Sequence, residues 1–232
     1  LAAIVGVPVF IAFAARVRSA EPRRPDEPMR ERLRLAPLVE LVGRPEVFVP
    51  LVVATLGTYV AQGLLSFLPT FLVDFRGYSP SAAGGVFSAF FLVRAGAQVG
   101  LGRLSDRIGR DAGIGAAFLA GALGLGGLVA VPAGTGVSSA VGLAVAVVLA
   151  GLGSSFFSAI DPRFMDALDD AERGAAFGLI RTVYTVIGSA GSAGVGLVAD
   201  TFGWGVSFAV IAGLSGLAFL VVVGNALAGR GR

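Results

Sequence analysis

Residues 102–110 read GRLSDRIGR and lie between two long apolar stretches, residues 82–102 and 112–132. Each stretch is about 20 residues long, which is the length that an α-helix needs to cross the hydrocarbon of a bilayer. A short charged segment between two such stretches is typical of a chain that turns back at a membrane surface. The sequence therefore predicts two membrane-spanning helices joined by a tight charged loop at residues 103–111.

The composition extends this prediction to the rest of the chain. Of the 232 residues, 55% are hydrophobic and 14% are charged, whereas soluble domains have about 25% charged residues. Four further stretches are apolar and long enough to span a membrane: residues 47–73, 137–160, 174–199 and 204–227. None of the six stretches alternates in hydrophobicity as the strands of a membrane barrel do. We therefore expect an all-α integral membrane protein with a six-helix bundle at residues 46–229.

The two ends of the chain differ from this bundle. Residues 1–15 are apolar but shorter than a full span, and we interpret them as the end of a truncated transmembrane helix. Residues 16–45 are rich in arginine and are expected to form a cytoplasmic linker, and residues 230–232 a cytoplasmic tail. The positive-inside rule places these segments and the loops 103–111 and 161–173 on the cytoplasmic side. The alternate loops contain a single arginine, Arg76.

The motif at residues 102–110 resembles the G-x-L-[AS]-D-R-x-G-R loop of the major facilitator superfamily, a large family of secondary transporters. Here Asp111 stands where the family usually has a further basic residue. Two other parts of the chain are similar to the family: FLP at residues 67–69 through GYS at 77–79, and Arg173-Gly174 through DTFGW at residues 200–204. The order resembles the second half of such a transporter, from the end of helix six, through the central loop, to helices seven to twelve.

This resemblance implies a transporter and not an enzyme, working by alternating access together with an N-terminal half of the same kind. It also implies that the loop after the second span is a gate, formed by Gly102, Asp106, Arg107, Gly109 and Arg110. We expect Asp106 to accept hydrogen bonds from backbone N–H groups or from Arg110. A static turn fixed by the two glycines is the alternative.

Two arginines inside the predicted spans point to the substrate. Arg94 lies about 12 Å and Arg181 about 10 Å from the cytoplasmic end of its span, at 1.5 Å per residue. Gln98 and Thr185 each follow an arginine by four residues and so share its helix face. Two guanidinium groups facing one cavity could bind a carboxylate or phosphate in bidentate fashion.

The sequence thus suggests a small organic anion as substrate, and the alternatives are a neutral solute or an exported drug. Either arginine could instead extend to the membrane surface or pair with an acid in the N-terminal half. An inert half-transporter that only assembles with other chains is a further alternative.

Polar residues are unevenly divided among the spans. The spans at 112–132 and 204–227 carry almost none, and in the family the corresponding helices support the other four, which surround the cavity. In the first span, Tyr59, Gln62 and Ser66 share one helix face. Their hydrogen-bonding groups could bind a ligand near the membrane midplane or bind a neighbouring helix, and the sequence leaves both interpretations open.

Several kinds of site are disfavoured. The chain contains no histidine or cysteine, and no Asp or Glu lies within the six predicted spans, so we expect no metal, no cofactor and no carboxylate proton relay here. The acidic loop 161–173 is interpreted as a solvated surface. Glycines inside the spans, such as Gly121, Gly124, Gly188 and Gly191, suit close helix packing better than nucleotide binding.

The basic residues lie in segments too polar and too short to form a nucleic-acid surface, so we expect lipid and a small molecule as partners. All 18 of them are arginine, and together with the high alanine and glycine content this indicates a prokaryote. The expected location is therefore a prokaryotic cell membrane.

Overall fold

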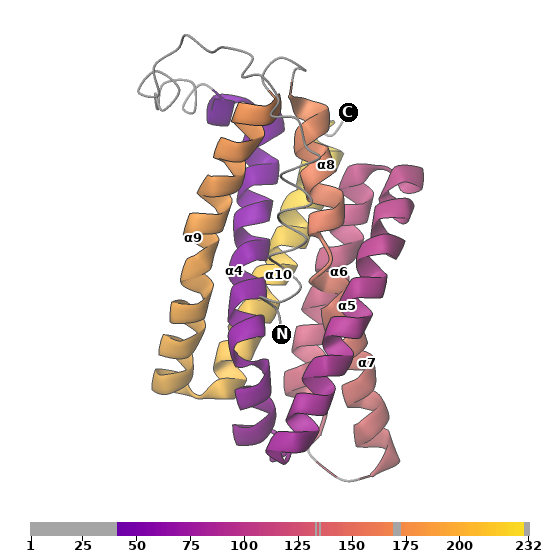
Figure 1. Ribbon diagram of the computed structural model, residues 1–232, viewed down its shortest axis with the longest axis vertical. Helices are drawn as coiled ribbons and strands as arrows, with labels where there is room; N and C mark the ends of the chain where they lie inside the picture. The colour runs from indigo at the N-terminus through magenta and orange to yellow at the C-terminus, as the bar shows by residue number, and fades with distance from the viewer. Residues whose placement is uncertain (1–40, 133, 135, 169–172, 230–232) are drawn as a thin grey trace, which may run out of the picture. The chain divides into compact units, whose positions relative to one another are not determined.

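A computed structural model of the chain describes residues 41–132, 134, 136–168 and 173–229. The partial helix predicted at residues 1–15, most of the predicted linker 16–45 and the tail 230–232 lie outside the described residues. The described helices belong to one compact unit, Leu38–Arg232, and are shown in Figure 1. They are α4 (Pro45–Asp74), α5 (Pro80–Ile108), α6 (Arg110–Ala130), α7 (Val137–Gly153), α8 (Phe157–Ala167), α9 (Arg173–Phe202) and α10 (Trp204–Leu227).

Six segments of the described chain are long and apolar enough to cross a membrane, because α7 and α8 together form one span, Val137–Ala167. The prediction of an all-α protein with six membrane-spanning segments is therefore confirmed. The described residues form no strand. Backbone groups in a bilayer must find partners within their own segment, and a continuous helix satisfies this requirement.

The helices extend further than the predicted spans. Helix α5 continues to Ile108 and α6 begins at Arg110, so only Gly109 separates them. The predicted loop at residues 103–111 is therefore wrong: most of this charged segment is helical. Gly109 has φ +98° and ψ 149°, a backbone conformation that is essentially restricted to glycine. The end of the apolar stretch marks where the lipid ends, and the helix itself continues until this glycine reverses the chain.

The fourth span is interrupted between α7 and α8. Ser154 and Ser155 direct their hydroxyl groups back into α7, where Ser154 Oγ donates to Ala150 O over 2.9 Å and Ser155 Oγ to Gly151 O over 3.0 Å. Serine side chains that bond to the preceding turn in this way bend helices. After the interruption α8 runs to Ala167, so the first part of the predicted loop 161–173 is helical as well.

Glycines allow the closest helix contacts. A Cβ atom on Gly191 of α9 would overlap the carbonyl oxygen of Tyr59 on α4, and one on Gly124 of α6 would overlap backbone atoms of Ala150 on α7. Helix association in lipid depends on such close packing, because lipid tails offer the helices no hydrophobic gain from contact with each other. The packing role predicted for these glycines is confirmed.

Arg76 is the single arginine at the end of the bundle opposite to Gly109. Its side chain is 9% exposed, and it donates hydrogen bonds to the carbonyl oxygens of Val131 and, over 3.4 Å, Pro132. These carbonyls follow the C-terminus of α6, where a positive charge interacts favourably with the helix dipole. Arg76 therefore ties the segment between α4 and α5 to the end of α6.

Helices α5 and α9 are the least buried of the six spans, whereas α4 is the most buried. Helix α4 packs mainly against α9, α6 against both α7 and α10, and α5 mainly against α7. Figure 1 shows α9 and α5 on opposite sides of α8. The two helices that carry the candidate arginines thus have the largest uncovered faces.

Candidate functional site

Arg94 is the middle residue of the 29-residue helix α5. Its backbone lies against the interruption of the fourth span, since Ser155 Oγ donates to Arg94 O over 3.2 Å. Within the described chain, the Arg94 guanidinium forms no ion pair, and its buried Nε has no hydrogen-bond partner. A cationic group at mid-helix therefore has unused hydrogen-bond donors.

The depth expected for Arg94 was counted from Gly102, where the apolar stretch ends. With α5 ending at Ile108, Arg94 is about 20 Å from either end of the helix at 1.5 Å per residue. An arginine side chain is far shorter than this distance. The Arg94 guanidinium therefore lies far from both ends of α5.

Arg181 has a different environment. It lies in the first third of α9 and its side chain is 58% exposed. Its NH1 is 3.7 Å from Asp161 Oδ2 on α8, and its guanidinium carbon is 6.0 Å from the centre of the Phe177 ring. The two arginines of the expected clamp therefore differ: Arg181 has an acidic partner within this chain, whereas Arg94 has none among the described residues.

Asp161 is the residue that sequence reasoning missed. It was assigned to a solvated surface at residues 161–173 because that segment is rich in charged residues, but α8 begins at Phe157 and contains Asp161. The segment is part of a candidate membrane span. Asp161 lies one residue beyond the predicted span 137–160 and inside this longer helical segment. The apolar residues Phe156, Ile160 and Phe164 recur every four positions, and this helical period could have extended the span.

The carboxylate of Asp161 has a second partner, Tyr184 of α9. The Tyr184 hydroxyl donates to Asp161 Oδ1 over 3.1 Å, and the tyrosine side chain is 1% exposed. Its ring stacks on Phe164 of α8 with the centroids 6.2 Å apart. The tyrosine thus fixes the position of the carboxylate that faces Arg181.

The remaining substrate candidates lie on three helices. Gln98 on α5 and Thr185 on α9 are both exposed. Tyr59 on α4 packs against glycines of α9, since a Cβ atom on Gly194 would overlap its hydroxyl. Ser66 Oγ is 2.8 Å from Ser192 Oγ of α9. For Tyr59 and Ser66 these contacts favour a role in joining α4 to α9, and Gln62 remains a ligand candidate on that face.

The five residues of the predicted gate lie around the α5–α6 junction. Arg110 forms an ion pair with Asp106, as expected, and a second one with Asp166 of α8 at 3.4 Å. Its NH1 also donates to Ser105 Oγ over 3.3 Å. Gly102 lies within α5, near Ser158 of α8, and Arg107 is exposed in the last turn of α5. Arg110 therefore joins the ends of α5, α6 and α8.

Asp111, where the family usually has a basic residue, has a local partner. Arg163 Nε of α8 donates to Asp111 Oδ1 over 3.0 Å, and the two side chains are 12% and 19% exposed. Asp111 Oδ2 is buried without a hydrogen-bond partner in the described chain. The acid that stands at position 111 in place of the family's usual basic residue is therefore paired with an arginine on α8.

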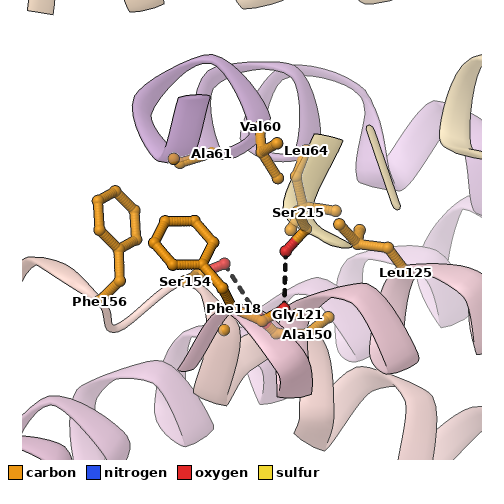
Figure 2. Close-up of a pocket in the computed structure, with 12 residues that line it drawn as sticks. Val60, Ala61, Leu64, Phe118, Gly121, Leu125, Ala150, Ser154, Phe156 and Ser215 are labelled. Carbon is orange, nitrogen blue, oxygen red and sulfur yellow. Dashed lines mark hydrogen bonds between the residues drawn. The ribbon is translucent and has the colours of Figure 1, made fainter. Parts of the chain in front are cut away.

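A small apolar cavity lies between α4, α6, α7 and α10 (Figure 2). Its two hydroxyl groups are already bonded to backbone carbonyls, Ser215 Oγ to Phe118 O over 3.0 Å and Ser154 Oγ to Ala150 O. With no free polar group it is a packing gap and not a substrate site. In the described segments no three His, Cys, Asp or Glu side chains form a possible metal site.

Comparison with known proteins agrees with the fold. The model of the Major Facilitator Superfamily matches residues 1–145 and residues 76–227, which together include nearly the whole chain. A search of the curated proteins found no match. With six apolar helices long enough to cross a bilayer and a family match over most of its length, this chain is an integral membrane protein that belongs to the Major Facilitator Superfamily of transporters.

Proposed function

We propose that this chain, together with an N-terminal half of the same family, carries a small organic anion across a prokaryotic cell membrane by alternating access. The single observation that carries the proposal is the guanidinium of Arg94 at the middle of α5, which has no ion-pair partner among the described residues. Charged residues inside membrane spans are rare and usually belong to a substrate or ion pathway.

The energetic argument favours an anionic substrate over a neutral one. Placing an arginine at the centre of a membrane helix costs about 2.5–3.5 kcal/mol or more. A carboxylate or phosphate would offset this cost by supplying the opposite charge and two acceptor oxygens for the planar guanidinium. A neutral solute supplies hydrogen-bond acceptors but no compensating charge.

Neighbouring groups support a ligand at this position. Gln98 lies one helical turn from Arg94 and is exposed, so it is suited to donate a further hydrogen bond. Arg181 and Thr185 on α9 are also exposed and supply a second cation and a hydroxyl. The uncovered faces of α5 and α9 are the surfaces that an N-terminal half would complete.

The test is uptake into proteoliposomes by the full-length transporter that contains this chain. Labelled monocarboxylates, dicarboxylates and inorganic phosphate are compared with neutral sugars. Arg94→Ala is expected to reduce anion uptake at least tenfold, a loss of about 1.4 kcal/mol of transition-state or substrate binding. Arg94→Lys should retain part of the wild-type anion uptake, because the positive charge remains but the bidentate geometry of the guanidinium is lost.

Arg103→Ala is the matched control, since Arg103 lies on the same helix near its end and is exposed. It should transport like the wild type. Anion uptake by Arg94→Ala at the wild-type rate and KM would overturn the proposal, as would uptake of neutral sugars alone.

A further inference from the structure

Helix α5 carries three phenylalanines shortly before Arg94: Phe87, Phe90 and Phe91. Phe90 is fully buried, whereas Phe91 is 43% exposed. The ring centroids of Phe87 and Phe91 are 4.9 Å apart with the planes at 80°, and those of Phe90 and Phe91 are 5.7 Å apart at 79°. Edge-to-face contacts of this kind are favourable for aromatic pairs. The ring of Phe91 is thus held in place by two neighbours while part of it remains uncovered.

Two of these rings share a helix face with the polar residues of α5. Successive residues of an α-helix are rotated by about 100°, so Phe87, Phe91, Arg94 and Gln98 form one stripe along the helix. A stripe with an arginine and a glutamine in the middle of a membrane span faces the protein interior or a water-filled cavity, and not lipid. Leu92, which is 77% exposed, is rotated away from Phe91 and lies outside this stripe. The uncovered part of Phe91 therefore lines the same space as the Arg94 guanidinium.

The contact of α5 with α7 leaves this stripe free. Val93 of α5 meets Gly151 of α7, where an added Cβ atom would lie 2.8 Å from Val93 Cγ1. Seen along the helix, Val93 is rotated from Arg94 in the direction opposite to Phe91. Arg94 and Phe91 are therefore on the edge of α5 that is turned away from α7.

One uncompensated positive charge lies beside these rings. Within the described chain, Arg94 forms no ion pair and its buried Nε has no hydrogen-bond partner. Arg181 already faces Asp161 at 3.7 Å, so a second negative charge would have to displace that acid. A single guanidinium binds one carboxylate through two parallel hydrogen bonds. The charges of the site therefore favour a monoanion over a dianion.

We propose that the anion bound by Arg94 is an aromatic monocarboxylate, whose ring packs on Phe91 and Phe87 while its carboxylate binds the guanidinium. This inference rests on the function proposed above and narrows it to one class of substrate. Gln98, one turn beyond Arg94, donates a further hydrogen bond to the carboxylate.

The spacing along α5 suits a molecule whose ring and carboxylate are close together. Phe91 precedes Arg94 by three residues, a rise of about 4.5 Å. Side chains of a helix lean toward its N-terminus, so the Arg94 side chain leans toward the turn that carries Phe91. In a benzoate the carboxylate is bonded directly to the ring, and both groups then fall within one turn of α5.

The uncovered ring of Phe91 explains why an aromatic anion is favoured over a small hydrophilic one. A substrate ring that covers Phe91 removes apolar surface from water and gains the directional attraction of an aromatic pair. Acetate or inorganic phosphate can satisfy Arg94 but leaves the Phe91 ring in contact with water. Because Phe91 is already fixed by its neighbours, its ordering adds little to the entropic cost of binding.

The test is equilibrium binding of labelled benzoate, acetate and benzamide to the detergent-solubilised full-length transporter at neutral pH. Benzoate should bind about tenfold or more tighter than acetate, which lacks the ring. It should also bind about tenfold or more tighter than benzamide, which lacks the charge. Phe91→Leu keeps an apolar side chain but removes the ring; it should weaken benzoate binding about threefold or more and leave acetate binding unchanged. Phe91→Tyr keeps the ring and should keep the wild-type preference for benzoate.

Leu92→Ala is the matched control, because Leu92 is an exposed apolar residue next to Phe91 but outside the stripe; it should bind both anions like the wild type. Equal binding of acetate and benzoate by the wild type would overturn this inference while leaving the proposed function intact. An unchanged benzoate affinity in Phe91→Leu would overturn it as well, and a lowered melting temperature would then show that Phe91 packs against the N-terminal half. Equal binding of benzamide and benzoate, or binding of neither anion, would instead overturn the proposed function.

Discussion

Arg110 forms an ion pair with Asp106 although the two residues lie on different helices. Asp106 is in the last turn of α5, Arg110 is the first residue of α6, and Gly109 between them reverses the chain. The same guanidinium reaches Asp166 of α8 at 3.4 Å. One partly exposed arginine thus joins three helices at this end of the bundle.

Arg110→Gln is expected to change transport more than stability. The ion pairs of Arg110 are largely exposed, and exposed pairs contribute about 0–1 kcal/mol. The melting temperature in detergent should therefore change little, whereas uptake should fall several-fold if these pairs hold one state of the gate. Equal uptake by variant and wild type would favour the static-turn alternative.

Gly109→Ala should destabilise the protein by about 1–3 kcal/mol, because a non-glycine residue is strained at this φ and ψ. No atom lies within 4 Å of the position of the added Cβ, so the cost is purely conformational. Gly100→Ala is the matched control: its Cβ also meets open space, but Gly100 has ordinary helical backbone in α5. Thermal unfolding in detergent should show a loss for Gly109→Ala and no loss for Gly100→Ala.

Gly191→Ala should separate α4 from α9. The new Cβ would overlap the carbonyl oxygen of Tyr59, and backbone cannot move aside as a flexible side chain can. Overpacking of this kind costs about 1–3 kcal/mol or more. The readout is the yield of monodisperse protein in size-exclusion chromatography. Gly178→Ala on the same helix, where nothing lies within 4 Å, should give the wild-type yield, and an equal yield for Gly191→Ala would contradict the packing.

The Arg163→Met variant should be less stable than the double variant that carries both Arg163→Met and Asp111→Asn. Removal of Arg163 leaves the Asp111 carboxylate, 19% exposed, without its cation, at a cost on the order of 2–3 kcal/mol. Neutralising Asp111 as well removes that charge. A double-mutant cycle on unfolding in detergent measures the coupling, and additive effects of the two substitutions would show that the pair contributes nothing.

The sequence was sufficient for the number and position of the membrane spans, because a stretch of about 20 apolar residues is a local property that needs no knowledge of the fold. It was insufficient for the ends of helices. Leu104, Arg107 and Ile108 continue α5 beyond the apolar stretch, since helical backbone is equally satisfied in lipid and in the interfacial region. The interruption at Ser154 and Ser155 also depends on hydroxyl groups bonding to the preceding turn, and hydropathy does not register that.

The candidate site was predicted in part. Arg94 and Arg181 stand out because charge is rare inside spans, and a single sequence reveals that directly. The partner of Arg181 could not be found in this way, because Asp161 lies on another helix and their contact is set by how α8 packs against α9. The same long-range geometry packs Tyr59 on the glycines of α9, which its own sequence neighbourhood does not reveal.

The short helix α8 connects three arginines that lie far apart in the sequence. Ser155, just before α8, bonds to the backbone of Arg94, Asp161 faces Arg181, and Asp166 faces Arg110. Since α8 is separated from α7 by the interruption at residues 154–156, its 11 residues form an element apart from the rest of their span. Any movement of α8 would therefore change its contacts with the mid-helix Arg94, with Arg181 and with Arg110 at the same time.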